Sequence, residues 1–416
     1  MQVKRAWLAR PDLVGNKLRA SFRESSLLRW RFLIFACRSS TGREDYQSKR
    51  ARCSAGGPFA RGLHDALVAG QMDSLRRFRE RFCTIAAIGL LCGGLLLAVR
   101  ANAQAPSLSS WNDGPAKQAI IAFVKQVTDH SSSKYVNPED RIATFDQDGT
   151  LWVEHPLYSQ AVFALDRVHE LAVQHPAWNQ QEPFKAVLAN DLSALAKFSE
   201  SDWEAIVAAT LTGMSTEAFA ELVKQWLAKA KHPRFHRAYT DLVYQPMLEV
   251  LVFLRANEFK TYIVTGGGQQ FVRVYSERIY GIPPEQVVGS GILTKYEYRD
   301  HKPVLIREPK VFFIDDFTGK PIGINLFIGK RPCAAFGNSA GDQQMLEWTQ
   351  GTSGAGLRML VLHDDPEREY AYGPAGGLPD TKVGTFPDSL MAEAKKRGWV
   401  IISMKNDWNR IFGFQE

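Results

Sequence analysis

Two aspartates separated by one residue, Asp146 and Asp148, are the side chains best placed for chemistry. They follow a short apolar run, residues 142–145, which is predicted to be a strand. Loops at the carboxyl ends of parallel strands form the sites of open α/β sheets, so both carboxylates are expected in one crevice. One can attack a substrate while the other transfers protons. The next residue, Gly149, lets the chain leave the strand sharply. Asp-x-Asp-Gly is also typical of an ordinary turn, and the motifs that follow favour a site.

Two later motifs also follow predicted strands. Thr265-Gly266-Gly267 offers a hydroxyl and N–H groups that can approach an oxyanion. The segment 337–342, Gly-Asn-Ser-Ala-Gly-Asp, places the amide of Asn338 and the carboxylate of Asp342 at another strand end. Lys320 lies between these motifs. Neither glycine cluster fits the dinucleotide-binding fingerprint or the P-loop.

The elements that must position these residues alternate between strand and helix, which predicts an α/β fold with helices on both faces of a parallel sheet. From residue 158 to about 256 the pattern is almost wholly helical, which indicates an inserted accessory domain. The predicted strands are 142–145, 259–264, 287–290, 334–336 and 359–362, with a hairpin at 292–314, and the predicted helices include 116–127, 161–171, 201–211, 216–230, 269–280 and 342–348.

These elements, in this order, resemble the haloacid dehalogenase superfamily of hydrolases over most of residues 140–365. Within it the chain looks closest to the phosphoserine-phosphatase-like and secreted acid-phosphatase branches, which have helical caps inserted after the first strand. The resemblance implies a Rossmann-like three-layer parallel sheet as a core, formed by residues 104–157 and 245–416. Residues 158–244 would form the helical cap.

The resemblance also implies a role for each motif residue. Asp146 would be the nucleophile that forms an aspartyl-phosphate, and Asp148 the general acid and base. Dehalogenases in the family have a different residue at the second position, so Asp148 favours phosphoryl transfer. The remaining implied roles are phosphoryl binding by Thr265, Gly266 and Gly267, neutralisation of charge by Lys320, and Mg²⁺ binding by Asp146, the backbone carbonyl of Asp148, and the Asn338/Asp342 group.

Two positions depart from the family pattern. Asn338 stands where a metal-binding aspartate is usual, and its amide oxygen brings no charge, so Asp342 could ligate directly or through water. The segment of Lys320 is shorter than usual, which leaves three rival lysines. These are Lys302, Lys310 and Lys330.

Other candidates are weaker. His363-Asp364-Asp365 follows a strand and could ligate a metal, but a solvated strand-end loop is the preferred interpretation. Trp152, Glu154 and His155 could shape a substrate pocket, or Trp152 could pack at the hinge into the cap. Cys333, in an apolar stretch, is expected to be a small buried hydrophobe and not a nucleophile.

Composition limits the class of protein. The 416 residues are 45% hydrophobic and 23% charged, which excludes a collagen, a disordered chain and a polytopic membrane protein. The net charge of +7 is uneven, because residues 1–103 hold 19 Lys and Arg against 7 Asp and Glu, and the other residues hold 32 against 37. The basic balance therefore does not indicate a nucleic-acid partner.

The uneven charge coincides with a targeting pattern. After Met72 come four arginines, an apolar run at 82–99, and Ala101-Asn102-Ala103. This is the layout of a secretory signal peptide, residues 72–103, cleaved after Ala103; the alternative is an uncleaved membrane anchor. Residues 1–71 would then be an unstructured upstream extension. A periplasmic or secreted protein is expected, without stable membrane association after cleavage.

The sequence thus predicts an exported Mg²⁺-dependent phosphomonoesterase that hydrolyses a small phosphate ester. A phosphotransferase or mutase using the same aspartyl-phosphate is an alternative, because the motif does not separate transfer to water from transfer to another hydroxyl. A non-catalytic protein that binds phosphorylated ligands is a second alternative, disfavoured by the presence of every acidic position. The substrate and the oligomeric state stay open.

Overall fold

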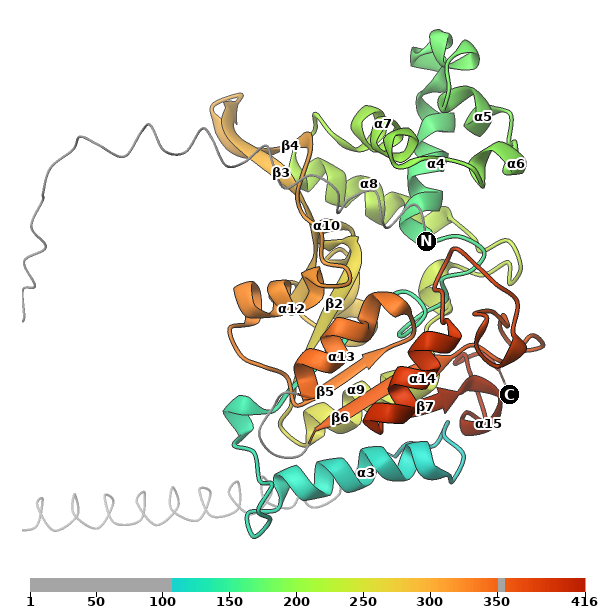
Figure 1. Cartoon of the computed structure of the whole chain (residues 1–416). Helices are drawn as coiled ribbons and strands as arrows, with labels where there is room; N and C mark the ends of the chain where they lie inside the picture. Colours follow the sequence, from blue (N-terminus) through green and yellow to red (C-terminus); the bar gives the residue numbers. More distant parts are fainter. Residues whose placement is uncertain (1–106, 351–355, 416) are drawn as a thin grey trace, which may run out of the picture. The chain divides into compact units, whose positions relative to one another are not determined.

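The strand that precedes Asp146 lies at the middle of the sheet. The computed structural model describes residues 107–350 and 356–415, and within them seven strands pair in the order β4-β3-β2-β1-β5-β6-β7 (Figure 1). Neighbours pair in parallel except β3 and β4, which are antiparallel. The strands are β1 (Ile142–Phe145), β2 (Lys260–Gly268), β3 (Val287–Arg299), β4 (Lys302–Phe313), β5 (Ala334–Gly337), β6 (Leu357–Leu362) and β7 (Val400–Ser403).

The helices follow the strands in alternation, apart from one block between β1 and β2. The α-helices are α3 (Pro115–Thr128), α4 (Ser159–Leu171), α5 (Phe184–Leu188), α6 (Leu192–Leu195), α7 (Glu200–Leu211), α8 (Thr216–Lys229), α9 (Gln245–Ala256), α10 (Gln269–Val272), α11 (Ser276–Tyr280), α12 (Gly319–Gly323), α13 (Gln343–Gln350), α14 (Asp388–Arg397) and α15 (Met404–Asp407). Short single-turn helices join them, among them η8 (Ile324–Ile328) and η9 (Ala340–Asp342).

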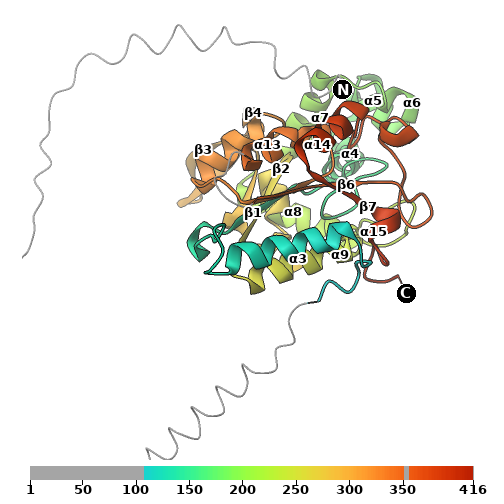
Figure 2. The ribbon, with the colours of Figure 1, turned by 60° about the horizontal axis from the view of Figure 1, so that its bottom comes forward.

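Successive strand residues point to opposite faces of the sheet and into different apolar clusters. On β6, Met359 and Val361 join a cluster with α3 and α9, whereas Leu360 joins one with α13 and α14. Figure 2 shows α3 and α9 on one side of the sheet and α13 and α14 on the other. The predicted α/β fold with helices on both faces is confirmed.

Helices α4 to α8 are inserted between β1 and α9, and we refer to them as the cap helices (Figure 1). They also contact the β3–β4 hairpin, whose far end leaves the sheet. Ser215, at the start of α8, bridges Ile306 of β4. The N–H of Gly213 donates to the carbonyl of Arg307 (2.8 Å), and the N–H of Arg307 donates to Met214 (2.9 Å). The hairpin predicted at 292–314 therefore contacts both the sheet and the cap helices.

The element limits differ from prediction in three places. The single helix predicted over 269–280 is wrong: α10 and α11 are separated at residues 273–275, because Tyr275 is buried in a stack on Trp152 (centroids 4.9 Å apart). Strand β2 runs four residues beyond the predicted end, since Gly268 pairs with Ser290. Strand β7 and helix α14 were not predicted.

The predictions for residues 1–71 and for the signal peptide at 72–103 lie outside the described residues. Within the described ranges, no helix is long and apolar enough to cross a bilayer.

Candidate active site

Asp146 lies at the carboxyl end of β1, at the bottom of a cavity. Its N–H donates to the carbonyl of Phe336 on β5 (2.9 Å), and 8% of the residue is exposed. The following turn depends on Gly149, whose φ is +74°. A Cβ at this position would come within 2.1 Å of Asn338 and 2.3 Å of Glu154. The close approach explains why glycine follows the two aspartates.

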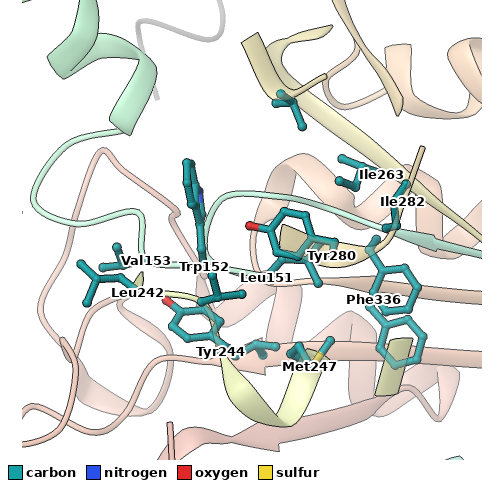
Figure 3. Close-up of a cluster of buried hydrophobic side chains, with 14 of the residues drawn as sticks. Leu151, Trp152, Val153, Leu242, Tyr244, Met247, Ile263, Tyr280, Ile282 and Phe336 are labelled. Carbon is teal, nitrogen blue, oxygen red and sulfur yellow. The ribbon is translucent and has the colours of Figure 1, made fainter. Parts of the chain in front are cut away.

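Buried apolar side chains hold the turn that carries the two aspartates in place. Leu151, Trp152 and Val153 pack near Leu242 and Tyr244 (Figure 3). The backbone reinforces this packing, because the N–H of Val153 donates to Leu242 (3.1 Å) and that of Tyr244 to Leu151 (2.9 Å). The loop that carries the two aspartates is thus held by core contacts.

Trp152 holds the second aspartate. Its indole N–H donates to Oδ1 of Asp148 (2.6 Å), and its ring is fully buried. The other carboxylate oxygen, Oδ2, lies on the side of Gly267, 3.8 Å from where a Cβ on that glycine would stand. Trp152 therefore orients Asp148, which neither interpretation of Trp152 from sequence anticipated.

Lys320 is fully inside the protein beside the first aspartate. Its Nζ lies 2.7 Å from Oδ1 of Asp146 and 2.8 Å from Oδ1 of Asp342, and it donates to the carbonyl of Val264 (2.7 Å). The three rival lysines are exposed. Lys330 pairs with Asp140 (2.6 Å). Of the four candidates, Lys320 is the one that contacts Asp146.

Asp146, Asp342 and Lys320 form a buried group with two carboxyl groups and one amine. Burial and the neighbouring Asp342 raise the pKa of Asp146 well above its usual range, and Lys320 opposes that shift. Burial disfavours the charge of Lys320, but Asp146 and Asp342 outweigh it and raise the pKa of the ammonium. Lys320 therefore keeps its proton and pairs with two buried carboxyl groups at once.

The predicted phosphate-binding residues line the same cavity. Thr265 is buried, and its Oγ1 accepts from the N–H of Gly267 (3.0 Å). Gln160, near the start of α4, reaches this loop from the cap helices: its Oε1 accepts from the N–H of Gly268 (2.7 Å). Nothing in the sequence singled out Gln160, because the contact joins residues 108 positions apart.

Asn338 has both ends of its side chain bonded. Its Oδ1 accepts from the hydroxyl of Thr150 (3.1 Å), and its Nδ2 donates to Oε1 of Glu154 (2.7 Å). The same Oε1 accepts from the hydroxyl of Tyr372 (2.8 Å). A carboxylate only accepts, so Glu154 fixes which way the amide of Asn338 points.

The interpretation of residues 363–365 as a solvated loop is wrong for His363 and Asp365, which are 2% and 5% exposed. His363 contacts the carbonyl of Gly149 through Nε2 (2.8 Å) and Glu369 through Nδ1 (3.1 Å). Burial lowers the pKa of His363, but Glu369 outweighs it and raises the value overall. The histidine supports the turn after Asp148.

Cys333 is 1% exposed, and burial raises the pKa of its thiol to about 11. The prediction that Cys333 is buried is confirmed.

The Mg²⁺ ligands expected from the family resemblance can be tested against these contacts. In the described part of the chain, no three His, Cys, Asp or Glu side chains converge as a metal cluster. Asp342 is engaged by Lys320 through Oδ1 and by the N–H groups of Asn338 and Ser339 through Oδ2 (3.0 Å each). Oδ1 of Asn338 accepts one hydrogen bond, from Thr150, and keeps a second lone pair, which favours Asn338 as the oxygen donor. Asp146, the Asp148 carbonyl and Asn338 are hard oxygen donors of the kind that Mg²⁺ accepts in small number, so the residues present fit the ion that the resemblance implies.

The cavity has a volume of about 260 Å³ and lies between the strand-end loops and the cap helices. We name its two sides by their residues. The cavity floor is Asp146, Asp148, Glu154, Thr265, Gly266, Gly267, Asp316 and Ser339, and the cavity wall is Tyr158, Gln160, Ala161, Ala164, Trp203, Val207 and Leu211.

Five of the sequence-predicted residues thus lie on one cavity floor, with Lys320 directly behind Asp146. Of Trp152, Glu154 and His155, Glu154 lines the cavity.

Residues 143–347 match the family model of haloacid dehalogenase-like hydrolases. The chain belongs to the haloacid dehalogenase superfamily. The matched residues include the motifs around Asp146, Thr265, Lys320 and Asn338, in the order expected. The narrower likeness to secreted acid phosphatases stays a prediction. No curated protein matches the chain.

Solved structures resemble the chain at low identity. A protein of unknown function from Bordetella pertussis is 17% identical (TM-score 0.38), with 63% of this chain and 97% of that one covered. A functionally unknown protein from Anaerococcus prevotii is 15% identical (TM-score 0.44; 72% and 97% covered). A phosphoserine phosphohydrolase-like protein from Francisella tularensis is 17% identical (TM-score 0.30; 54% and 88% covered). These likenesses leave the substrate of this superfamily member open.

Proposed function

We propose that this protein is an exported, Mg²⁺-dependent phosphomonoesterase that hydrolyses a small phosphate ester through an aspartyl-phosphate at Asp146. The observation that carries the proposal is the 2.7 Å contact between Lys320 and Asp146 at the cavity floor. A carboxylate that attacks a phosphate ester must overcome like-charge repulsion, and a buried, protonated lysine beside it offsets that repulsion.

In the first step, a carboxylate oxygen of Asp146 attacks phosphorus, and the bond between phosphorus and the ester oxygen breaks. Asp148 gives its proton to the leaving oxygen, so the alcohol departs neutral. The hydroxyl of Thr265 and the N–H of Gly266 bind the phosphoryl oxygens as charge shifts onto them.

In the second step, Asp148, now ionised, takes a proton from water as the water oxygen attacks phosphorus. The bond between phosphorus and the Asp146 oxygen breaks, which releases phosphate and regenerates both carboxyl groups. The indole of Trp152 keeps Asp148 in one orientation through both proton transfers.

Bound Mg²⁺, held by Asp146, the Asp148 carbonyl and Asn338, would supply positive charge that lowers the repulsion between nucleophile and phosphate. Lys320 supplies part of this charge permanently from behind Asp146.

The test is Asp146→Asn. We expect phosphate release from p-nitrophenyl phosphate to fall by about 10³-fold or more, because the amide is not a competent nucleophile. Circular dichroism and the urea midpoint should show an intact fold. Unchanged phosphate release would overturn the mechanism, and undiminished release by the wild type in EDTA would overturn the Mg²⁺ requirement.

The alternatives are separable on the same protein. Added alcohol acceptors would yield new phosphate esters from a phosphotransferase, whereas a phosphomonoesterase yields inorganic phosphate alone. A protein that only binds phosphorylated ligands would show no Mg²⁺-dependent hydrolysis.

Export rests on the basic, apolar and small-residue pattern of residues 72–103. N-terminal sequencing of the exported protein should begin at Gln104. A mature protein that begins far from Gln104 would contradict the proposed cleavage.

A further inference from the structure

The cavity wall is largely apolar. Helix α7 contributes Trp203, Val207 and Leu211, and α4 contributes Ala161 and Ala164. Leu211 and Ala164 are buried, whereas Trp203 and Val207 are half-buried and face the space above the floor. A substrate that places its phosphoryl group on the floor therefore directs its alcohol portion against aliphatic side chains and an indole.

The acidic and basic side chains that line the cavity are all carboxylic acids. They are Asp146, Asp148, Glu154 and Asp316; no Lys, Arg or His lines it. Lys320 is 1% exposed and lies behind Asp146, with its donors directed to Asp146, Asp342 and the Val264 carbonyl. Away from the proposed Mg²⁺ site, a second anionic group on a substrate would meet carboxyl groups and an apolar wall, with no basic side chain to pair with.

The volume limits the alcohol portion as well. About 260 Å³ is near the lower end for small-molecule sites, and the phosphoryl group takes part of it. The remaining space suits one ring or a short chain.

We propose that the substrates are phosphate monoesters of small, uncharged, largely apolar alcohols, and that esters whose alcohol portion carries an anionic group are rejected. This substrate class rests on the proposed phosphomonoesterase function. Trp203 and Val207 supply the contact surface for the alcohol, and the lack of a lining Lys, Arg or His, together with the carboxylates of Glu154 and Asp316, supplies the rejection.

A neighbouring cavity of about 530 Å³ limits the length of the substrates that can be used to test this proposal. It shares Trp203 and Val207 with the first cavity, and Lys310 of β4 also lines it. A long anionic substrate could pass α7 and reach that cation. The test therefore uses alcohols too short to do so.

The experiment compares phenyl phosphate with 4-carboxyphenyl phosphate, which differ by one carboxylate. For the wild type with Mg²⁺, we expect kcat/KM to be at least 30-fold higher for phenyl phosphate. In Val207→Lys, the ratio should fall at least tenfold, because the ammonium can pair with the added carboxylate. The matched controls are Val207→Met, which changes size without charge, and Ala208→Lys, which adds the charge at a residue that lines the neighbouring cavity alone.

The outcomes separate the two proposals. Rapid hydrolysis of both esters at similar kcat/KM would overturn the substrate class and leave the phosphomonoesterase standing. An unchanged ratio in a folded Val207→Lys, or an equal shift in Val207→Met, would also overturn it. Absence of hydrolysis of either ester would overturn the phosphomonoesterase proposal and the substrate class together. If Val207→Lys does not fold, the wild-type ratio alone decides.

Discussion

The cavity floor and the cavity wall face the same space but are built from different parts of the chain. The floor lies at the ends of parallel strands, where Asp146 accepts from Lys320 (2.7 Å) and Asp148 accepts from Trp152 (2.6 Å). The wall lies on helices α4 and α7, where Trp203 and Val207 are half-buried and offer the substrate an apolar contact surface. The difference separates two properties: changes in the floor should alter the rate for every ester, and changes in the wall should alter which ester is preferred.

After Asp146→Asn, the largest effect is expected from Lys320→Met. Loss of the ammonium leaves Asp146 and Asp342 buried together, so the rate with p-nitrophenyl phosphate should fall by about 10²–10³-fold. The free energy of unfolding should drop by about 3–5 kcal/mol, the usual cost of removing one partner of a buried ion pair. Urea unfolding and steady-state kinetics measure the two effects.

Lys330→Met is the control for this change, since Lys330 also forms an ion pair, with Asp140, but on the surface. Its rate and urea midpoint should match the wild type. Wild-type turnover in Lys320→Met would show that the charge on the floor is not needed for the reaction.

A smaller loss of activity is expected from a substitution at Asn338, and a second substitution at Glu154 should reverse that loss. Asn338→Asp restores the residue usual in the family, yet here it would place two carboxylates in contact where the amide now donates over 2.7 Å. We expect a loss of about 10–100-fold in activity and a lower urea midpoint without metal.

Adding Glu154→Gln to Asn338→Asp supplies a new amide donor. The double variant should regain the urea midpoint of the wild type, and its activity should return to within about tenfold of the wild type. Higher activity or a higher midpoint in Asn338→Asp alone would contradict the role given to Glu154.

The smallest effect is expected from Trp152→Phe, which removes the donor to Asp148. One hydrogen bond to a charged group corresponds to about a tenfold loss, and it should appear in kcat with KM little changed. Trp226→Phe is the matched control, because Trp226 donates to Asp166 (2.7 Å) in the cap helices, away from the cavity. Equal losses in both variants would indicate a packing effect in place of an effect on Asp148.

The fold was largely predictable because its strands are short apolar runs followed by polar turns. Strand β1 has the predicted limits, since all four residues are buried on both faces of the sheet. The helix predicted at 269–280 failed because Tyr275 turns into the core to stack on Trp152, a contact between residues far apart in sequence. Periodicity reports which residues are apolar but not which distant ring they meet.

The candidate site shows the same division. Asp146, Thr265 and Asn338 were recognisable because each follows an apolar run predicted to be a strand, and parallel strand ends meet at one edge of the sheet. The sequence could not distinguish Lys320 from the three rival lysines, because the distinction depends on a 2.7 Å contact with Asp146, which lies 174 residues away in the chain. The role of Glu154 in orienting Asn338 was hidden for the same reason.

The β3–β4 hairpin constrains how substrate reaches the cavity. Strand β3 begins in the sheet beside β2, and β4 is hydrogen-bonded to the chain between α7 and α8. The guanidinium of Arg307 on β4 also donates to the carbonyl of Leu211 (2.8 Å) and lies 3.7 Å from the ring centroid of Phe219. The cap helices are thus tethered to the sheet by a third connection besides the two through which the chain enters and leaves them. A wide swing of the helices would have to bend a continuous strand or break these bonds, so exchange of ester and phosphate is expected to proceed through small local movements at the rim.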